Sequence, residues 1–196
     1  FVTSKIAMSL DGRVAMQSGE SKWITSKASR DDVQLLRSQN QAILTGSGTI
    51  LSDNPMLTVR NKKLESSPLR VVIDSNNLLT DKSLNIFSSG PDTLIFNQSN
   101  SNTLDNGKVD LKLTLSKLGE LGINNVLLEA GSGLNSAMIN AKLIDEFIIY
   151  IAPVLLGSDA QPMMDLSFQK MSEKISLNII KLTQIANDLK IRAKPI

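Results

Sequence analysis

Two segments of this 196-residue chain combine the same residue types in a pattern that could bind an anion. ILTGSGTI at 43–50 and LLEAGSGL at 127–134 each place Gly-Ser-Gly between an apolar run and an expected helix start. We call residues 46–48 the first corner and residues 131–133 the second corner. Glycine lets the backbone turn sharply, and the amide groups at a helix N-terminus attract phosphates. Two such corners indicate a dinucleotide, although a tight turn explains either one alone. The second lacks the third glycine of the Rossmann fingerprint.

The first expected strand, at 2–8, adds a lysine next to a small residue. Under the two-residue period of a strand, Val2, Ile6 and Met8 share an apolar face. Lys5 and Ala7 then point together to the opposite side. This pair suits a closely approaching ligand, and the alternative is a solvated lysine on an edge strand.

Further polar side chains could bind a phosphorylated substrate. Glu129 follows an apolar run and directly precedes the second corner, where ligand crevices form in α/β proteins. Ser21, Arg37 and Arg60 form a set that could bind a phosphate monoester, because guanidinium groups grip phosphate oxygens in a fork. The alternatives are a solvent-facing carboxylate at a strand end and ordinary surface arginines.

The composition excludes several kinds of chemistry. The chain has no histidine and no cysteine, which rules out disulfides, thiolate nucleophiles, Cys/His zinc sites and a Ser–His–acid triad. We expect no metal site, with only a carboxylate site left open. The net charge of +2 is dispersed, and aromatic residues make up 4%, so nucleic-acid and membrane surfaces are not indicated. Without a signal peptide or a spanning apolar run, we expect a cytoplasmic protein.

The elements that must position these residues are short strands and helices. Runs rich in Val and Ile predict strands at 2–8, 42–44, 70–73, 93–96, 125–128 and 147–151. A C-terminal hairpin is expected from 177–182 and 189–192, with Asn187 and Asp188 as its turn. Polar stretches at 61–67 and 97–108 are predicted loops.

Three helices are expected between the strands. Ser26 is predicted to cap a helix that runs to about residue 40 and buries Ala28, Val33 and Leu36. A shorter helix is expected at 115–121. The spacing of the next helix predicts one buried face made of Leu134, Ala137, Met138 and Ala141.

This order of elements predicts an α/β fold in which strands and helices alternate and antiparallel strands follow at the end. We expect one domain over residues 1–196. The apolar segment LIDEFIIYIAPVLLG at 143–157 could be a dimer surface or a central core strand.

Several long segments, taken in order, resemble a known family. They are KIAMSLDGRVAMQSGESKWIT, DVQLLRSQNQAILTGSGTILSDNPMLTVR, RVVIDS, VLLEAGSGLNSAM and LIDEFIIYIAPVLLGSDA. Together they are similar to the reductase domain of bacterial bifunctional riboflavin-biosynthesis proteins. The resemblance runs from Lys5 to about Ala160 and is weaker beyond. It implies a dihydrofolate-reductase-like three-layer domain with a central mixed, mostly parallel sheet and antiparallel C-terminal strands.

The resemblance also implies an NADPH-dependent activity and assigns residues to it. The substrate would be 5-amino-6-(5-phosphoribosylamino)uracil, reduced to the ribitylamino compound. The cofactor-binding residues would be Ala7, Trp23, Thr49, Asp53, Ser75, Gly131, Ser132, Gly133, Leu134, Asn135, Ser136 and Ala137. The substrate-binding residues would be Ser21, Arg37, Leu57, Arg60 and Glu129, with Leu57 acting through its backbone. Trp23 has core packing as its alternative.

Residue types alone would assign the cofactor's ribose site to the wrong residue. An acid at a strand end, here Asp74, usually indicates NAD through the ribose hydroxyls. The family instead uses the neighbouring Ser75 near the 2′-phosphate.

As a mechanism, we expect hydride transfer from the nicotinamide to C1′ of the opened ribose, with Ala7 and Thr49 bordering the nicotinamide. The proton donor is left among Lys5, Asp53, Glu129 and water. We favour Lys5 and Asp53 as catalytic residues, with Glu129 contacting the pyrimidine.

Alternatives and partners stay open at this point. The substrate could be the undeaminated 2,5-diamino-pyrimidinone analogue, or the chain could be a non-catalytic NADP-binding module. The family's usual partner is a fused N-terminal zinc deaminase domain, whose H-x-E and P-C-x-x-C signature this chain lacks. A homodimer or higher homo-oligomer is also expected.

Overall fold

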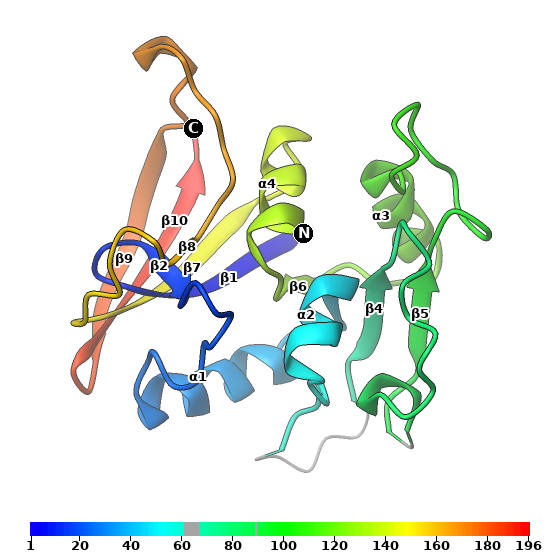
Figure 1. Cartoon of the computed structure of the whole chain (residues 1–196), viewed down its shortest axis with the longest axis horizontal. Coiled ribbons are helices and arrows are strands. Elements are labelled where there is room, and N and C mark those ends of the chain that lie inside the picture. The colour runs from blue at the N-terminus through cyan, green and yellow to red at the C-terminus, as the bar shows by residue number, and fades with distance from the viewer. Residues whose placement is uncertain (61–66, 89) are drawn as a thin grey trace. The chain divides into compact units, whose positions relative to one another are not determined.

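The computed structural model describes residues 1–60, 67–88 and 90–196, so most of the predicted loop at 61–67 lies outside the described residues. The chain divides into two compact units (Figure 1). The first unit comprises Phe1 and Gln34–Ala130, and the second comprises Val2–Val33 and Gly131–Ile196. Helix α1 (Lys27–Ser38) contributes residues to both. That residues 1–196 form one domain stays a prediction.

The first unit is a parallel α/β arrangement. Its strands are β3 (Ala42–Gly46), β4 (Leu69–Ile73), β5 (Thr93–Phe96) and β6 (Val126–Leu128). They pair in the order β5-β4-β3-β6, all in parallel. Its shorter helices are α2 (Ser47–Asp53), η1 (Asn85–Phe87) and α3 (Leu111–Glu120). One apolar cluster in its interior consists of Ile43, Ile50, Leu57, Val72, Leu79, Leu84 and Ile86.

The second unit holds the antiparallel strands. Its main strands are β1 (Val2–Ser9), β7 (Glu146–Ala152), β9 (Leu177–Ile185) and β10 (Asp188–Pro195). β1 and β7 are parallel, whereas β10 is antiparallel to both β7 and β9. A second, two-stranded sheet that the sequence did not predict pairs β2 (Arg13–Ala15) with β8 (Gln161–Pro162). The remaining helices are α4 (Ser132–Asn140) and η2 (Met171–Glu173).

These strands confirm the predicted fold class, a mostly parallel mixed sheet with antiparallel C-terminal strands. The segment at 147–151 is a core strand, because β7 lies between β1 and β10 and is almost entirely buried. The predicted hairpin turn was placed one residue too late. Ile185 pairs with Asp188, so Ala186 and Asn187 form the turn and Asp188 belongs to β10. None of the described helices has the length and hydropathy needed to cross a bilayer.

Helix α1 confirms the predicted cap and corrects the predicted buried face. The Ser29 amide donates to the Ser26 hydroxyl at 3.3 Å, so Ser26 caps the helix. Val33 and Leu36 are buried as predicted, but Ala28 is exposed. Ser29 takes its place in the interior because its hydroxyl donates to a buried carboxylate, that of Asp188, at 2.6 Å.

Helices α3 and α4 also differ from their predicted patterns. Helix α3 starts four residues before 115, because the Asp110 carboxylate accepts the Leu113 amide and caps it. In α4, Met138 is buried as predicted, but Ala137 and Ala141 are exposed and Leu134 is only half-buried. The helix buries polar residues on its inner face instead, and their hydrogen bonds are described below.

Candidate functional site

The first corner joins β3 to α2 without a side-chain cap. Gly46 is the N-cap residue, with φ −107° and ψ 158°, and because glycine has no side chain it makes no side-chain cap hydrogen bond. The amides of the first turn therefore receive no bond from an N-cap side chain. Thr49 is half-buried in the first turn, and Asp53 is exposed at the end of the helix, where the Ser52 hydroxyl donates to it at 3.1 Å.

The second corner begins α4 in the same way, at Gly131 with φ −70° and ψ 178°. The side chain of Asn135 turns back to the corner and donates to the Gly131 carbonyl at 3.2 Å. Its carbonyl oxygen accepts the Ser4 hydroxyl from β1 at 2.7 Å. Ser136 accepts the Asp165 amide at 2.7 Å. These bonds explain why Asn135 and Ser136 are buried in place of alanines.

Both corners carry a glycine that the fold does not require. A Cβ added at Gly48 or at Gly133 would meet no described heavy atom within 4 Å, and neither glycine has a left-handed φ. Glycine in a helix costs roughly 0.5–1 kcal/mol relative to alanine. Close approach of a ligand to the backbone is a physical reason for glycine at both positions.

The first unit brings Arg37 and Glu129 together in a largely buried, bidentate ion pair. Arg37 Nε lies 2.6 Å from Glu129 Oε1, and Nη2 lies 3.0 Å from Oε2. The two side chains are only 12% and 10% exposed. Burial lowers the pKa of the Arg37 guanidinium, but the charge and hydrogen bonds of Glu129 outweigh burial and raise it. The paired carboxylate therefore favours the charged form of Arg37.

The same unit places the segment at 57–60 next to Arg37. Arg37 Nη1 donates to the Thr58 carbonyl at 3.1 Å, and the Arg60 amide donates to Gln34 of α1 at 3.0 Å. Leu57 has a left-handed φ of 48° and is buried in the apolar cluster. The Arg60 side chain is exposed. Arg37, Glu129 and this segment thus form one polar site.

At the end of β4, the structure separates the roles of Asp74 and Ser75. Asp74 is 2% exposed, and its two oxygens accept the amides of Leu78 and Leu79 at 2.9 and 3.0 Å. The Asp74 carboxylate is therefore buried and engaged within the turn, which disfavours its contact with a ribose. Ser75 is half-buried, and its oxygen accepts the Val109 amide at 3.0 Å.

In the second unit, the predicted site residues lie on β1 and in the loop after β2. Lys5 and Ala7 are half-buried, in agreement with one shared face of β1. Ser21 is half-buried in the loop. The alternative that Trp23 packs in the core is wrong. Its side chain is 70% exposed, and the Arg30 guanidinium stacks 4.2 Å from its ring centroid.

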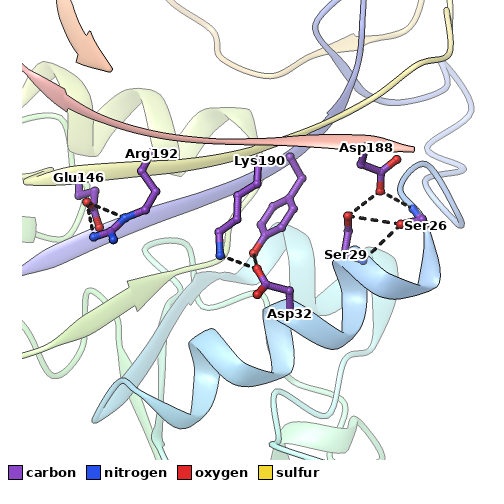
Figure 2. Close-up of polar contacts among 8 residues, drawn as sticks. Ser26, Ser29, Asp32, Glu146, Asp188, Lys190 and Arg192 are labelled. Atoms are coloured by element: carbon purple, nitrogen blue, oxygen red, sulfur yellow. Dashed lines mark hydrogen bonds and ion pairs between the residues drawn. The ribbon is translucent and has the colours of Figure 1, made fainter. Parts of the chain in front are cut away.

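A row of polar contacts in the second unit was missed by sequence reasoning (Figure 2). Three alternate residues of β10 each bind a neighbouring element: Asp188 accepts the Ser26 amide and the Ser29 hydroxyl, Lys190 binds Asp32, and Arg192 binds Glu146. Burial raises the pKa of Asp188, but bonds from Ser29 and Ser26 and the charge of Arg30 bring it below its usual value. The two-residue spacing in β10 was the available signal.

The described residues do not offer a metal site, since no three His, Cys, Asp or Glu side chains among them are grouped to hold an ion. The candidate chemistry is therefore that of the corners, the arginine–carboxylate pair and the residues beside them.

A family model for the RibD C-terminal domain matches residues 1–191. The chain belongs to the RibD C-terminal domain family. The riboflavin biosynthesis protein RibD of Escherichia coli K12 is 38% identical over 96% of this chain and 58% of its own length. A Buchnera aphidicola protein named 5-amino-6-(5-phosphoribosylamino)uracil reductase is 38% identical over 92% of this chain and 99% of its own length.

Solved structures agree with the family assignment. RibD of Acinetobacter baumannii matches with a TM-score of 0.89 and 34% identity, over 100% of this chain and 58% of that one. Dihydrofolate reductase from Enterococcus faecalis matches with a TM-score of 0.55 and 13% identity, which shows likeness of fold. The resemblance drawn from the sequence is confirmed. The chain spans 58% of the length of the first RibD relatives it matches.

Proposed function

We propose that this family member is a reductase of riboflavin biosynthesis that acts on 5-amino-6-(5-phosphoribosylamino)uracil. One observation carries the proposal. The Buchnera aphidicola relative named for this reaction matches this chain over 99% of its own length, so the region of RibD that this chain matches corresponds to a whole protein named as the reductase.

The polar site of the first unit supports binding of a phosphorylated, polar substrate. A guanidinium has five donors, and Arg37 uses three of them on Glu129 and Thr58. The other two donors of Arg37 bond to none of the described residues, and we assign them to a phosphate oxygen. Arg60 adds an exposed cation on a backbone tied to α1. We assign Arg37, Arg60, Ser21 and the Leu57 backbone to the ribose phosphate, and Glu129 to the pyrimidine.

The residues present fit NADPH. The helix N-termini at both corners suit phosphates, and the open faces of Gly48 and Gly133 let a ligand approach the backbone. The exposed ring of Trp23 offers an apolar contact surface. When bound, NADPH supplies a hydride. We assign to it Ala7, Trp23, Thr49, Asp53, Ser75 and residues 131–137.

Lys5 and Asp53 are proposed to supply and relay the proton. The chain has no histidine, and lysine and aspartate are side chains that can transfer a proton. Lys5 projects from a half-buried position on β1, and Asp53 stands at the exposed end of α2. Replacing Lys5 by Ala is expected to lower kcat while binding of NADPH persists.

The test is NADPH oxidation measured with the uracil substrate and with its undeaminated 2,5-diamino analogue. Turnover of the uracil compound is the expected result. Turnover of the analogue alone would change the substrate, and binding of NADPH without oxidation by either would identify a non-catalytic module. Arg60→Ala is expected to raise KM for the phosphorylated substrate about tenfold, the effect of one charge-assisted contact. An unchanged KM would remove Arg60 from the phosphate site.

We further propose that the protein is a cytoplasmic homo-oligomer. In the longer relatives, we propose that the partner of this reductase domain is a fused zinc deaminase domain. Strand β9 lies at the end of the strand order β1-β7-β10-β9, and four of its apolar side chains are exposed. They are Leu177, Ile179, Ile180 and Leu182, at 41–60% exposure. An apolar edge strand favours pairing with another chain. Light scattering of Ile179→Lys tests this proposal, with a smaller species as the expected result.

A further inference from the structure

We propose that Lys108 is a specificity residue that binds the 2′-phosphate of NADPH, an inference that rests on the proposed cofactor. Nothing in the residue pattern of the chain pointed to this lysine. Its place follows from the contacts between the turn after β4 and the loop that precedes α3.

The backbone of this loop joins it to Ser75. The Val109 amide donates to the Ser75 hydroxyl oxygen at 3.0 Å. Lys108 is the residue directly before Val109, and its ammonium group lies 3.2 Å from Asn76 Oδ1. Two successive loop residues thus bind two successive turn residues. The charge of Lys108 is therefore held beside Ser75 by the structure.

The loop itself is ordered by hydrogen bonds around Lys108. The Leu104 amide donates to the Lys108 carbonyl at 2.8 Å, and the Gln98 side chain donates to the Gly107 carbonyl at 2.7 Å. An isolated bridge pairs Thr103 with Val109. Because the backbone is fixed, the lysine stem alone has to move to meet a ligand.

The chemistry of these groups matches a phosphate monoester. Ser75 accepts one bond and donates to none of the described residues, so its hydroxyl proton can be donated to a ligand. Lys108 is exposed and supplies a full positive charge. Asp74, the carboxylate that directly follows β4, is buried and binds backbone amides with both oxygens, so it does not present its oxygens to the ligand. A cation next to a hydroxyl favours a ribose phosphate over a ribose hydroxyl pair.

The experiment measures binding to the full chain by calorimetry with four probes: NADPH, NADH, 2′,5′-ADP and AMP. Lys108→Ala is expected to weaken NADPH and 2′,5′-ADP about tenfold, which is about 1.4 kcal/mol, and to leave NADH and AMP unchanged. Lys108→Glu is expected to weaken the first pair further. Raising the salt concentration is expected to shrink the difference between wild type and Lys108→Ala, because an exposed charge pair is screened.

The matched control is Lys117→Ala, which removes another exposed lysine, on α3, and is expected to bind all four probes as the wild type does. Equal affinity of Lys108→Ala and wild type for 2′,5′-ADP would overturn the assignment, as would equal weakening of all four probes. A wild type that binds NADPH and NADH equally would remove the lysine's role and leave the reductase proposal standing. A wild type that binds neither would overturn both.

Discussion

The two corners share three residues and then anchor their helices by opposite means. Counting from the first glycine, the fifth residue is Ile50 in the first corner and Asn135 in the second. Both are essentially buried, at 0% and 1% exposure. Ile50 packs into the apolar cluster of the first unit, whereas Asn135 binds Ser4 and the Gly131 carbonyl.

This difference shows that the Gly-Ser-Gly sequence sets how each helix starts, whereas the surrounding residues set how each helix is anchored. The shared residues give the same uncapped helix start in both units. The residue that fixes the helix depends on whether the neighbouring strand supplies apolar atoms or a hydroxyl. Mutations at and around the fifth position therefore test the two modes of anchoring directly.

The largest effect is expected from Ile50→Ala. Removing a fully buried isoleucine from the apolar cluster leaves a cavity and lowers the free energy of unfolding by about 2–5 kcal/mol. Urea unfolding followed by circular dichroism measures this change. Leu51→Ala, at a side chain that is 48% exposed, is the control and is expected to change stability by less than about 0.5 kcal/mol. Equal effects would show that the first corner is not anchored by packing.

Asn135→Ala is expected to have a smaller but distinct cost. It removes the hydrogen bonds to Ser4 and to the Gly131 carbonyl and leaves the buried Ser4 hydroxyl without this acceptor, a loss of about 1–3 kcal/mol. The double variant Ser4→Ala/Asn135→Ala separates this cause from simple loss of volume. Because both polar partners are then gone, it is expected to cost less than the sum of the two single changes. Strict additivity would contradict the hydrogen-bonded anchor.

Gly48→Ala and Gly133→Ala are expected to affect the cofactor more than the fold. A methyl group has open space at both positions, so the free energy of unfolding stays level or rises by up to about 1 kcal/mol. Affinity for NADPH is expected to fall several-fold, as measured by calorimetry. If one variant alone loses affinity, only that corner approaches the ligand. A lower free energy of unfolding in both variants would show that the fold itself requires the two glycines.

The smallest effect is expected from a carboxylate that anchors the second unit through polar contacts. A hydrogen bond from Ser9, together with the amides of Gly157 and Leu156, lowers the pKa of Asp11 from 3.8 to about 2. Its contribution to stability is present above about pH 4 and is lost as the pH falls toward 2, because the unfolded chain takes up the proton first.

Unfolding of Asp11→Asn measured across this range is therefore expected to depend less steeply on pH than unfolding of the wild type. Asp105→Asn, at an exposed carboxylate of the first unit, is the control. Identical slopes for wild type and Asp11→Asn would show that this anchor does not contribute.

Much of the fold was predictable because local residue patterns set it. Runs of Val and Ile predicted β1, β3–β7, β9 and β10 to within a few residues, since β-branched residues between turn residues favour strands. The pair β2 and β8 was missed, because strands of three and two residues carry no periodic signal. The buried face of α4 was wrong, because helical spacing weighs apolar residues and does not foresee a buried Asn135 with its partners in place.

The candidate site was predictable only in part, for the same reason. The corners, Arg37 and Glu129 could be singled out as residues, but the sequence assigned Arg37 to a phosphate and did not predict that its guanidinium also holds Glu129, 92 positions away in the chain. Trp23 could be named by resemblance, whereas its exposure and its contact with Arg30 depend on the tertiary structure.

By itself, the sequence determined the class of fold, the family, the two uncapped helix starts and the absence of histidine and cysteine chemistry, because each depends on residue type and near-neighbour order. Only the tertiary structure decided which carboxylates are already engaged by the fold, such as Asp74 and Asp188, and which lysine stands beside Ser75. Such pairings depend on which distant segments fold against one another. Hydrogen bonds and ion pairs form over about 3 Å, and no local pattern specifies distances between residues far apart in the chain.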